Sequence, residues 1–209
     1  TTGLGWSALV EGFRFTYRTR IIWGTMLLDF MATFFSSART MLPIVATDLL
    51  GLGPAGYGLL ATAQSVGALI AGGVMALRQD IYRQGLVLLV SVAVYGAATA
   101  LFGFSTIFWL SYFLFALTGA GDTVSTVIRG TLRQLNTPDH LRGRMTSVNM
   151  MFFMGGPQLG ELEAGLVAAV FGVPLAIISG GVLTVLLTGV IAWRYPSLRN
   201  YVGQQVVED

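Results

Sequence analysis

The sequence predicts an all-α integral membrane protein with six transmembrane helices. Of its 209 residues, 54% are hydrophobic and 11% are charged, and its mean hydropathy is +0.72. Soluble domains carry about 25% charged residues, so this chain has too little polar surface to coat a water-facing globule. Six stretches approach the roughly 20 apolar residues that a helix needs to cross a bilayer. They are Ile21–Ala46, Gly58–Leu77, Leu86–Phe104, Ile107–Ile128, Met145–Phe171 and Pro174–Trp193.

Taken in order, the spans differ in composition. The first, Ile21–Ala46, is too long for a signal peptide, and five more spans follow it. In the second, small residues recur at near-helical spacing, which favours close packing between membrane helices. These residues are Ala61, Ser65, Ala68, Gly72 and Ala76, together with Gly67, Ala71 and Gly73. The third and sixth spans are almost wholly apolar, whereas the first, fourth and fifth contain polar residues at membrane depth.

The charged residues divide the connections between spans into two kinds. All twelve basic residues are arginine, and ten lie before the first span, after the last one, or in and beside the charged loops 79–84 and 135–144. Connections 51–56, 105–106 and 172–173 contain no basic residue. An excess of arginine is typical of cytoplasmic loops. We therefore expect both termini and both charged loops in the cytoplasm, and an even number of spans also requires the termini to share a side.

The sequence outside the spans is short. We interpret residues 1–20 as the end of a cytoplasmic linker that lies on the membrane, residues 21–193 as the six-helix bundle and residues 194–209 as a cytoplasmic tail. The chain begins with Thr1 and Thr2 rather than Met, so we expect a fragment whose upstream part is missing.

Composition also excludes several classes of protein. The chain has no Cys, which excludes disulfides and thiolate metal sites, and its one His makes a zinc enzyme or a His-based triad unexpected. No nucleotide-binding motif is present. The net charge of +2 reflects arginines at the membrane surface rather than a nucleic-acid site. We expect no enzymatic activity, no metal, no cofactor and no nucleic-acid partner.

The first span carries a polar stripe. Asp29, Thr33, Ser36 and Thr40 recur at the spacing of one helical face, and Arg39 lies about 80° from that face. Charges in hydrocarbon are costly and usually face a bundle interior or a watery cavity. The stripe therefore predicts either a cavity lining, with Asp29 as a proton or substrate site, or a seam of interhelical hydrogen bonds.

The fourth span repeats this pattern with Asp122 and Arg129 on one face. Asp122 is either functional or part of a structural ion pair. Because Arg129 lies about 10 Å away along the helix axis, we expect a partner for Asp122 on another helix. Arg129 and Arg133 approach the cytoplasmic end, where a long side chain can reach the membrane surface.

The fifth span is the richest in polar residues. Pro157 removes a backbone hydrogen bond and predicts a kink, and discontinuous helices often build transporter sites. Asn149 and Glu163 share one face, whereas Gln158 and Glu161 share nearly the opposite one. We therefore expect one glutamate to face a cavity and the other a neighbouring helix, unless this segment is simply hydrated at the membrane surface.

Three segments resemble a known family. Residues 73–85 (GVMALRQDIYRQG) resemble a degenerate form of the cytoplasmic loop motif of the major facilitator superfamily. Residues 137–147 (TPDHLRGRMTS) and 155–165 (GGPQLGELEAG) are similar to the loop between the tenth and eleventh helices, and to the eleventh helix, of its enterobactin-exporter-like branch. The likeness extends from about Arg18 to Tyr201 and covers the C-terminal half of such a transporter.

The resemblance implies a function and a set of roles. The spans would be helices seven to twelve, and a missing N-terminal six-helix half would complete the transporter. Such proteins lie in the bacterial inner membrane and export small molecules, such as siderophores or amphipathic drugs, usually with a proton gradient. The candidates for lining the cavity or for proton coupling are Asp29, Arg39, Asp122, Asn149, Gln158, Glu161 and Glu163. The candidates for cytoplasmic gating are Asp80, Arg83, Arg129, Arg142 and Arg144. The alternative is a membrane scaffold, or a half-transporter that works only with a partner.

Overall fold

The computed structural model describes residues 6–36, 40–78 and 81–203, with side chains described from Val10 onward, and every regular element in these ranges is helical. The all-α prediction is confirmed. Within the described residues, three helices are long and apolar enough to cross a membrane. These are α4 (Pro54–Leu77), α5 (Gln84–Phe104) and α8 (Val173–Arg194).

Two further helices are longer but carry more charge. Helix α6 (Phe108–Leu135) continues past the predicted end at Ile128, and α7 (Arg142–Phe171) begins three residues before the predicted start. A 3-10 turn, Asp139–Leu141, connects them. The short helix α9 (Pro196–Arg199) follows α8.

The first predicted span is interrupted. Helix α2 (Arg20–Phe35) has 16 residues, and the chain resumes as a short α3 (Leu42–Ile44) followed by a π-helical turn, Val45–Leu49. Residues 37–39 lie outside the described ranges. Pro43 lies in the first turn of α3, where a backbone N–H would have no partner within the helix, so the missing N–H of proline costs no hydrogen bond. The expectation of one continuous helix through residue 46 was therefore wrong.

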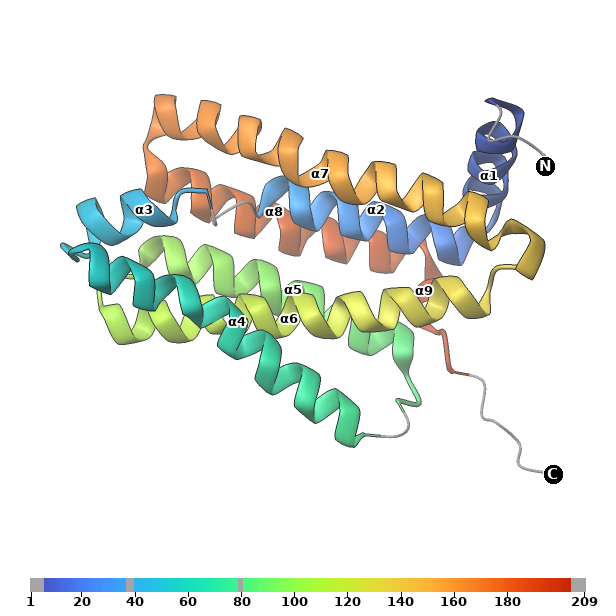
Figure 1. Ribbon diagram of the computed structural model, residues 1–209, viewed down its shortest axis with the longest axis horizontal. Helices are drawn as coiled ribbons and strands as arrows, with labels where there is room; N and C mark the ends of the chain where they lie inside the picture. Colours follow the sequence, from blue (N-terminus) through green and yellow to red (C-terminus); the bar gives the residue numbers. More distant parts are fainter. Residues whose placement is uncertain (1–5, 37–39, 79–80, 204–209) are drawn as a thin grey trace.

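The helices form an elongated bundle whose two ends differ (Figure 1). Helix α1 (Trp6–Arg18), α9 and the connection from α6 to α7 lie toward the right-hand end, and the last turn of α4 projects below the bundle toward that side. Helix α3 and the connections from α5 to α6 and from α7 to α8 lie at the left-hand end. The arginine-rich segments thus share one end, which we call the arginine-rich end.

The packing pattern has an approximate internal symmetry. Helix α6 packs against α4 and α5, and α2 packs in the same way against α7 and α8, while α5 and α8 pack against each other. The chain thus forms two sets of three helices, α2–α4–α5 and α6–α7–α8. The first helix of each set packs against the last two helices of the other set. This exchange is the arrangement expected of two three-helix repeats with inverted topology.

Glycine allows α4 and α6 to cross closely. A Cβ atom on Gly67 of α4 would lie 1.8 Å from the Ala116 carbonyl oxygen of α6, and one on Gly119 would lie 1.9 Å from the Gln64 carbonyl oxygen. The packed face of α4 consists of Leu60, Ala63, Gly67 and Ala71. The stripe predicted from Ala61, Ser65, Ala68, Gly72 and Ala76 is half-buried or exposed instead. Close packing by small residues was predicted, and two of the residues named for it, Gly67 and Ala71, lie on the packed face of α4.

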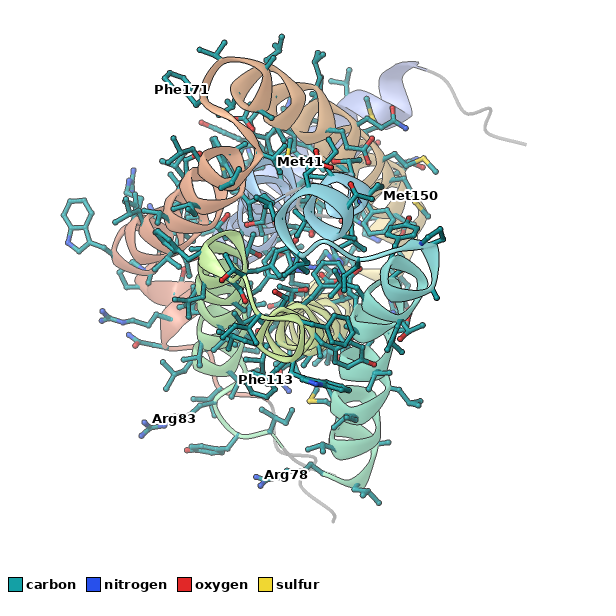
Figure 2. The ribbon with its side chains drawn as sticks, turned by 90° about the vertical axis from the view of Figure 1, so that its left-hand side faces the viewer. Met41, Arg78, Arg83, Phe113, Met150 and Phe171 are labelled. Atoms are coloured by element: carbon teal, nitrogen blue, oxygen red, sulfur yellow. The ribbon has the colours of Figure 1, made fainter. Side chains whose placement is uncertain are left out.

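Large apolar side chains cover much of the outer surface. Exposed fractions reach 77% for Leu69, 78% for Trp193 and 86% for Leu77. Figure 2 shows Met150 and Phe171 pointing away from the helices, whereas the buried Met41 lies near the middle of the view. Soluble monomers rarely expose contiguous apolar surface on this scale. The surface is suited to lipid and to packing against other membrane helices.

Candidate functional site

A buried ion pair joins α2 to α6. The Arg129 Nη1 atom lies 2.9 Å from Asp29 Oδ1, and the two side chains are 3% and 4% exposed. The N–H groups of Arg129 do not point at Asp29 Oδ1 with the geometry of a hydrogen bond. The contact is therefore an electrostatic attraction between the two charged groups. Because an isolated charge is very unfavourable away from water, each of these buried groups requires the other as its counter-charge.

Arg129 has a second carboxylate within reach. The Asp122 Oδ1 atom lies 3.8 Å from Arg129 Nη2, and the Asp122 side chain is 52% exposed. Arg129 Nη2 also donates a hydrogen bond of 2.9 Å to Thr126 Oγ1. We expected a partner for Asp122 on another helix, but its ion-pair partner is Arg129 of the same helix. The long Arg129 side chain spans the two helical turns that separate the residues. Arg129 therefore lies between one buried and one half-exposed carboxylate.

A second arginine extends the cluster to α7. Arg133 is 9% exposed, and its Nη1 donates a hydrogen bond to Asn149 Oδ1. Arg129 and Arg133 are one turn apart and share a face of α6. We call Asp29, Asp122, Arg129, Arg133 and Asn149 the polar centre. Its two carboxylates balance its two guanidinium groups, so this partly buried cluster carries no formal excess charge.

The contact between Arg133 and Asn149 gives a direct prediction. Asn149→Leu keeps the branching of the side chain but removes the acceptor, so we expect destabilisation by about 1–3 kcal/mol, the desolvation penalty of an unsatisfied buried group. Asn149→Asp retains an acceptor beside the guanidinium and is the matched control. The measurement is thermal unfolding of the detergent-solubilised protein by circular dichroism. Equal unfolding midpoints for Asn149→Leu and the unmodified protein would contradict the assignment.

The polar stripe of the first span is divided among several helices. Asp29 faces α6, whereas the Ser36 hydroxyl lies 2.9 Å from the Thr184 hydroxyl of α8. The Thr33 hydroxyl donates to the Asp29 carbonyl oxygen at 2.9 Å within its own helix. Helix α2 ends before Thr40, and Arg39 lies outside the described residues. The four polar residues therefore do not line one cavity, because α2 is surrounded by neighbours on several sides and stops at Phe35.

Helix α7 brings only Asn149 to the polar centre. Pro157 lies inside a continuous helix, so the expected discontinuity is absent from this helix. At 1.5 Å per residue, Glu161 and Glu163 lie about 18 and 21 Å from Asn149 along the axis. Gln158 and Glu161 are exposed and Glu163 is half-buried. The structure does not bring these three side chains to the polar centre, and the divergence of the two glutamates agrees with their helical spacing.

Two candidate gating arginines pair with carboxylates at the arginine-rich end. Arg142 lies 3.0 Å from Asp139 in an exposed pair. Arg144 lies 2.5 Å from Glu11 of α1, a partner that the sequence analysis missed because nothing in the spacing connects positions so far apart.

The remaining gating candidates divide between loop and interior. Arg83 is exposed beside the first turn of α5, and Asp80 lies outside the described residues. Arg129 differs from the expectation, because it is 2% exposed within the bundle rather than at a loop. Its carboxylate partners provide the reason: with Asp29 and Asp122 in reach, the side chain does not need to extend to the membrane surface.

Among the described residues, no group of three or more His, Asp or Glu side chains is arranged to hold a metal ion. The chemistry available at the polar centre is therefore that of carboxylates, guanidinium groups and an amide: proton binding, ion pairing and hydrogen bonding.

Comparison with known proteins identifies the family. A sequence model of the transmembrane secretion effector family of the major facilitator superfamily matches residues 5–205. The chain belongs to this family. The resemblance noted in residues 73–85, 137–147 and 155–165 is thereby confirmed, and the family consists of membrane transporters rather than enzymes.

The most similar relatives considered are exporters. The chain is 31% identical over 189 residues to the enterobactin exporter EntS of Salmonella typhi, with 87% of this chain and 45% of that protein covered. It is 28% identical over 184 residues to the enterobactin exporter EntS of Escherichia coli O1:K1, with 88% of this chain and 44% of that protein covered. The chain thus spans about half the length of the curated relatives it matches.

Proposed function

We propose that this chain is the C-terminal half of a proton-coupled exporter that works by alternating access. The observation that carries the proposal is Arg129, held between the buried Asp29 and the half-exposed Asp122. Family membership supports the transporter class, and the share of the relatives that is matched supports the assignment to one half. The other half would be a second six-helix bundle that rocks against this one.

The proposed membrane placement has six crossings. Helices α4, α5 and α8 are apolar enough to cross without help. Helices α6 and α7 are long enough, at 28 and 30 residues, and the charges of Arg129 and Arg133 are turned inward to partners. Helix α2, continued by α3 and the π-helical turn, provides the remaining crossing. The arginine-rich end would face the cytoplasm of a bacterial inner membrane.

The unequal burial of the two carboxylates suggests separate roles. Asp29 is enclosed with Arg129 and would serve as its fixed counterion. Asp122 is half-exposed and only 3.8 Å from the same guanidinium, so it can exchange a proton with the transport pathway. Protonation would remove the attraction of Asp122 for Arg129 while the contact with Asp29 persists. A group that binds a proton differently in two states biases the equilibrium between them.

The proposed substrate is a small molecule of the kind that the relatives export. Those relatives are enterobactin exporters, so enterobactin is the first compound to test, followed by other siderophores and amphipathic drugs. The polar centre could serve both substrate and protons, because it exposes one carboxylate beside guanidinium groups.

The test is transport of enterobactin into inside-out vesicles that contain the full-length protein. The variants are Asp29→Asn, Asp122→Asn, Glu161→Gln and Glu163→Gln, with Asp48→Asn as a control that replaces an exposed carboxylate outside the polar centre. We expect Asp122→Asn to abolish transport driven by a pH gradient while substrate exchange without a gradient continues. Asp29→Asn should lower both, because it disturbs the position of Arg129.

Two results would contradict the proposal. Gradient-driven transport that is unaffected in all four variants would remove proton coupling through these carboxylates. No protein-dependent transport for any compound tested, together with full tolerance of apolar replacements at Asp29 and Asp122, would favour the non-transporting scaffold.

A further inference from the structure

A second site lies at the arginine-rich end, away from the polar centre. A cavity of about 410 Å³ opens between the first turn of α5 and the segment that follows α9. It is lined by Arg83, Leu86, Arg199, Asn200, Tyr201 and Val202. The transport mechanism proposed above uses none of these residues as a substrate or proton site.

The wall of this cavity is held by specific contacts. The Gly85 amide donates to the Tyr201 carbonyl oxygen at 3.2 Å, and the Gly203 amide donates to the Tyr82 carbonyl oxygen at 3.1 Å. The Tyr201 hydroxyl accepts a hydrogen bond of 3.2 Å from the Asn136 side chain at the end of α6. Leu198 is fully buried beneath the segment. The segment after α8 is therefore fixed against α5 and α6, and the cavity is part of the fold.

Two arginines give the cavity its charge. Arg83 and Arg199 come from different elements and are both exposed, and within the described residues no carboxylate lies within ion-pair distance of either. The nearby Arg194 is positioned differently, since its guanidinium lies 5.8 Å from the centre of the Tyr195 ring. Two guanidinium groups beside one cavity favour an anion, above all a phosphate group.

An apolar track leads away from the same cavity. Leu86, Val90 and Val94 recur every four residues along α5 and are 40%, 52% and 40% exposed. They share one face of the helix, which begins at the cavity because Leu86 lines it. A phosphate site that continues into an exposed apolar strip matches the two parts of a phospholipid, a charged headgroup and an acyl chain.

We propose that Arg83 and Arg199 bind the phosphodiester headgroup of an anionic phospholipid, with an acyl chain along Leu86, Val90 and Val94. This inference rests on the membrane placement proposed above, which puts the arginine-rich end at the level of the cytoplasmic headgroups. Basic pockets at this level are suited to anionic lipids. The lipid would brace the segment after α8 against α5 from the membrane side.

The test is native mass spectrometry of the full-length protein in detergent with added phosphatidylglycerol or phosphatidylcholine. We expect preferential binding of phosphatidylglycerol, and about fivefold weaker binding for each of Arg83→Gln and Arg199→Gln. Arg83→Lys and Arg199→Lys keep the charge and should retain most of the binding. Arg78→Gln is the matched control, because Arg78 is an exposed arginine at the same end that lines a different cavity; Figure 2 shows Arg78 and Arg83 at separate places on the lower edge.

The outcomes separate this inference from the proposed function. Equal binding of the two lipids, or unchanged phosphatidylglycerol binding in the double Gln variant, would overturn the lipid site even if gradient-driven transport is observed. If Arg78→Gln weakens phosphatidylglycerol binding to the same degree, the binding depends only on general surface charge, and the proposed lipid site is also overturned. Displacement of the lipid by inorganic phosphate or by short-chain phosphatidylglycerol at equal concentration would identify a soluble-anion site without the acyl track.

Discussion

Arg129→Met should destabilise the helix bundle by about 3–5 kcal/mol, the range found when one member of a buried ion pair is removed. The reason is Asp29, which is 4% exposed in its side chain and would lose the guanidinium that lies 2.9 Å away. The loss of packing is small, because Met preserves most of the aliphatic length of arginine. The measurement is the midpoint of thermal unfolding in detergent, with gradient-driven transport as a second readout.

Two further variants make this prediction specific. Asp29→Asn combined with Arg129→Met removes both charges, so the double variant should be more stable than Arg129→Met alone. Arg142→Met breaks the exposed pair with Asp139, whose N–O distance of 3.0 Å is nearly the same, and should change stability by about 1 kcal/mol or less. Equal destabilisation by Arg129→Met and Arg142→Met would mean that burial of the Asp29 pair carries no energetic weight.

Gly67→Ala should separate α4 from α6 and destabilise the protein by about 1–3 kcal/mol or more, the usual range for overpacking. A Cβ at this position would lie 1.8 Å from the Ala116 carbonyl oxygen, which belongs to the backbone and cannot move without shifting the helix. Gly119→Ala should have a similar effect from the other side of the crossing, where the separation is 1.9 Å. Both are measured as unfolding midpoints in detergent.

The same helices contain matched controls for this prediction. Gly73 of α4 and Gly130 of α6 have open space where a Cβ would lie. Gly73→Ala and Gly130→Ala should be neutral or stabilising by up to about 1 kcal/mol, because Ala is the better helix former. If Gly67→Ala and Gly73→Ala unfold at the same temperature, α4 and α6 do not cross as closely as described.

Hydropathy predicted the cores of most helices but not their ends. Helix α4 begins at Pro54 rather than Gly58, and α6 continues to Leu135 rather than stopping at Ile128. The extension of α6 contains Arg129 and Arg133, which lower hydropathy but do not break a helix. The interruption after Phe35 coincides with the polar run 36–40 (SSART), which the predicted span included because apolar residues lie on both sides of it.

Helical spacing predicted part of the polar centre. It placed Asp122 and Arg129 on one face of α6 and selected Asp29 as a buried carboxylate. It could not pair Asp29 with Arg129, since a hundred residues separate them and only the packing of α2 against α6 brings them together. The same limit applies to Arg133 and Asn149, whose contact depends on the path from α6 through the turn into α7.

The glutamates of α7 illustrate how sequence density can mislead. Glu161 and Glu163 lie in the richest polar segment of the sequence, yet they are about 18 and 21 Å along the helix from Asn149. Polar residues that are close in sequence form a site only where other helices pack against them. Which helices pack there depends on the tertiary structure. Carboxylate burial by a neighbouring helix, as for Asp29, is the more informative signal.

The central claim is that the half-exposed side of the polar centre faces a water-filled transport pathway while the outer face of α5 faces lipid. The chain contains no Cys, so single cysteines can be placed without interference from this sequence. Thr126 is exposed and contacts Arg129, so Thr126→Cys tests whether water reaches the half-exposed side of the polar centre. Val90→Cys tests whether water reaches the outer face of α5. Each is treated in membranes with a membrane-impermeant maleimide, in a background without other cysteines. We predict labelling at Thr126→Cys and protection at Val90→Cys; protection at Thr126→Cys, or equal labelling at both positions, would contradict the account.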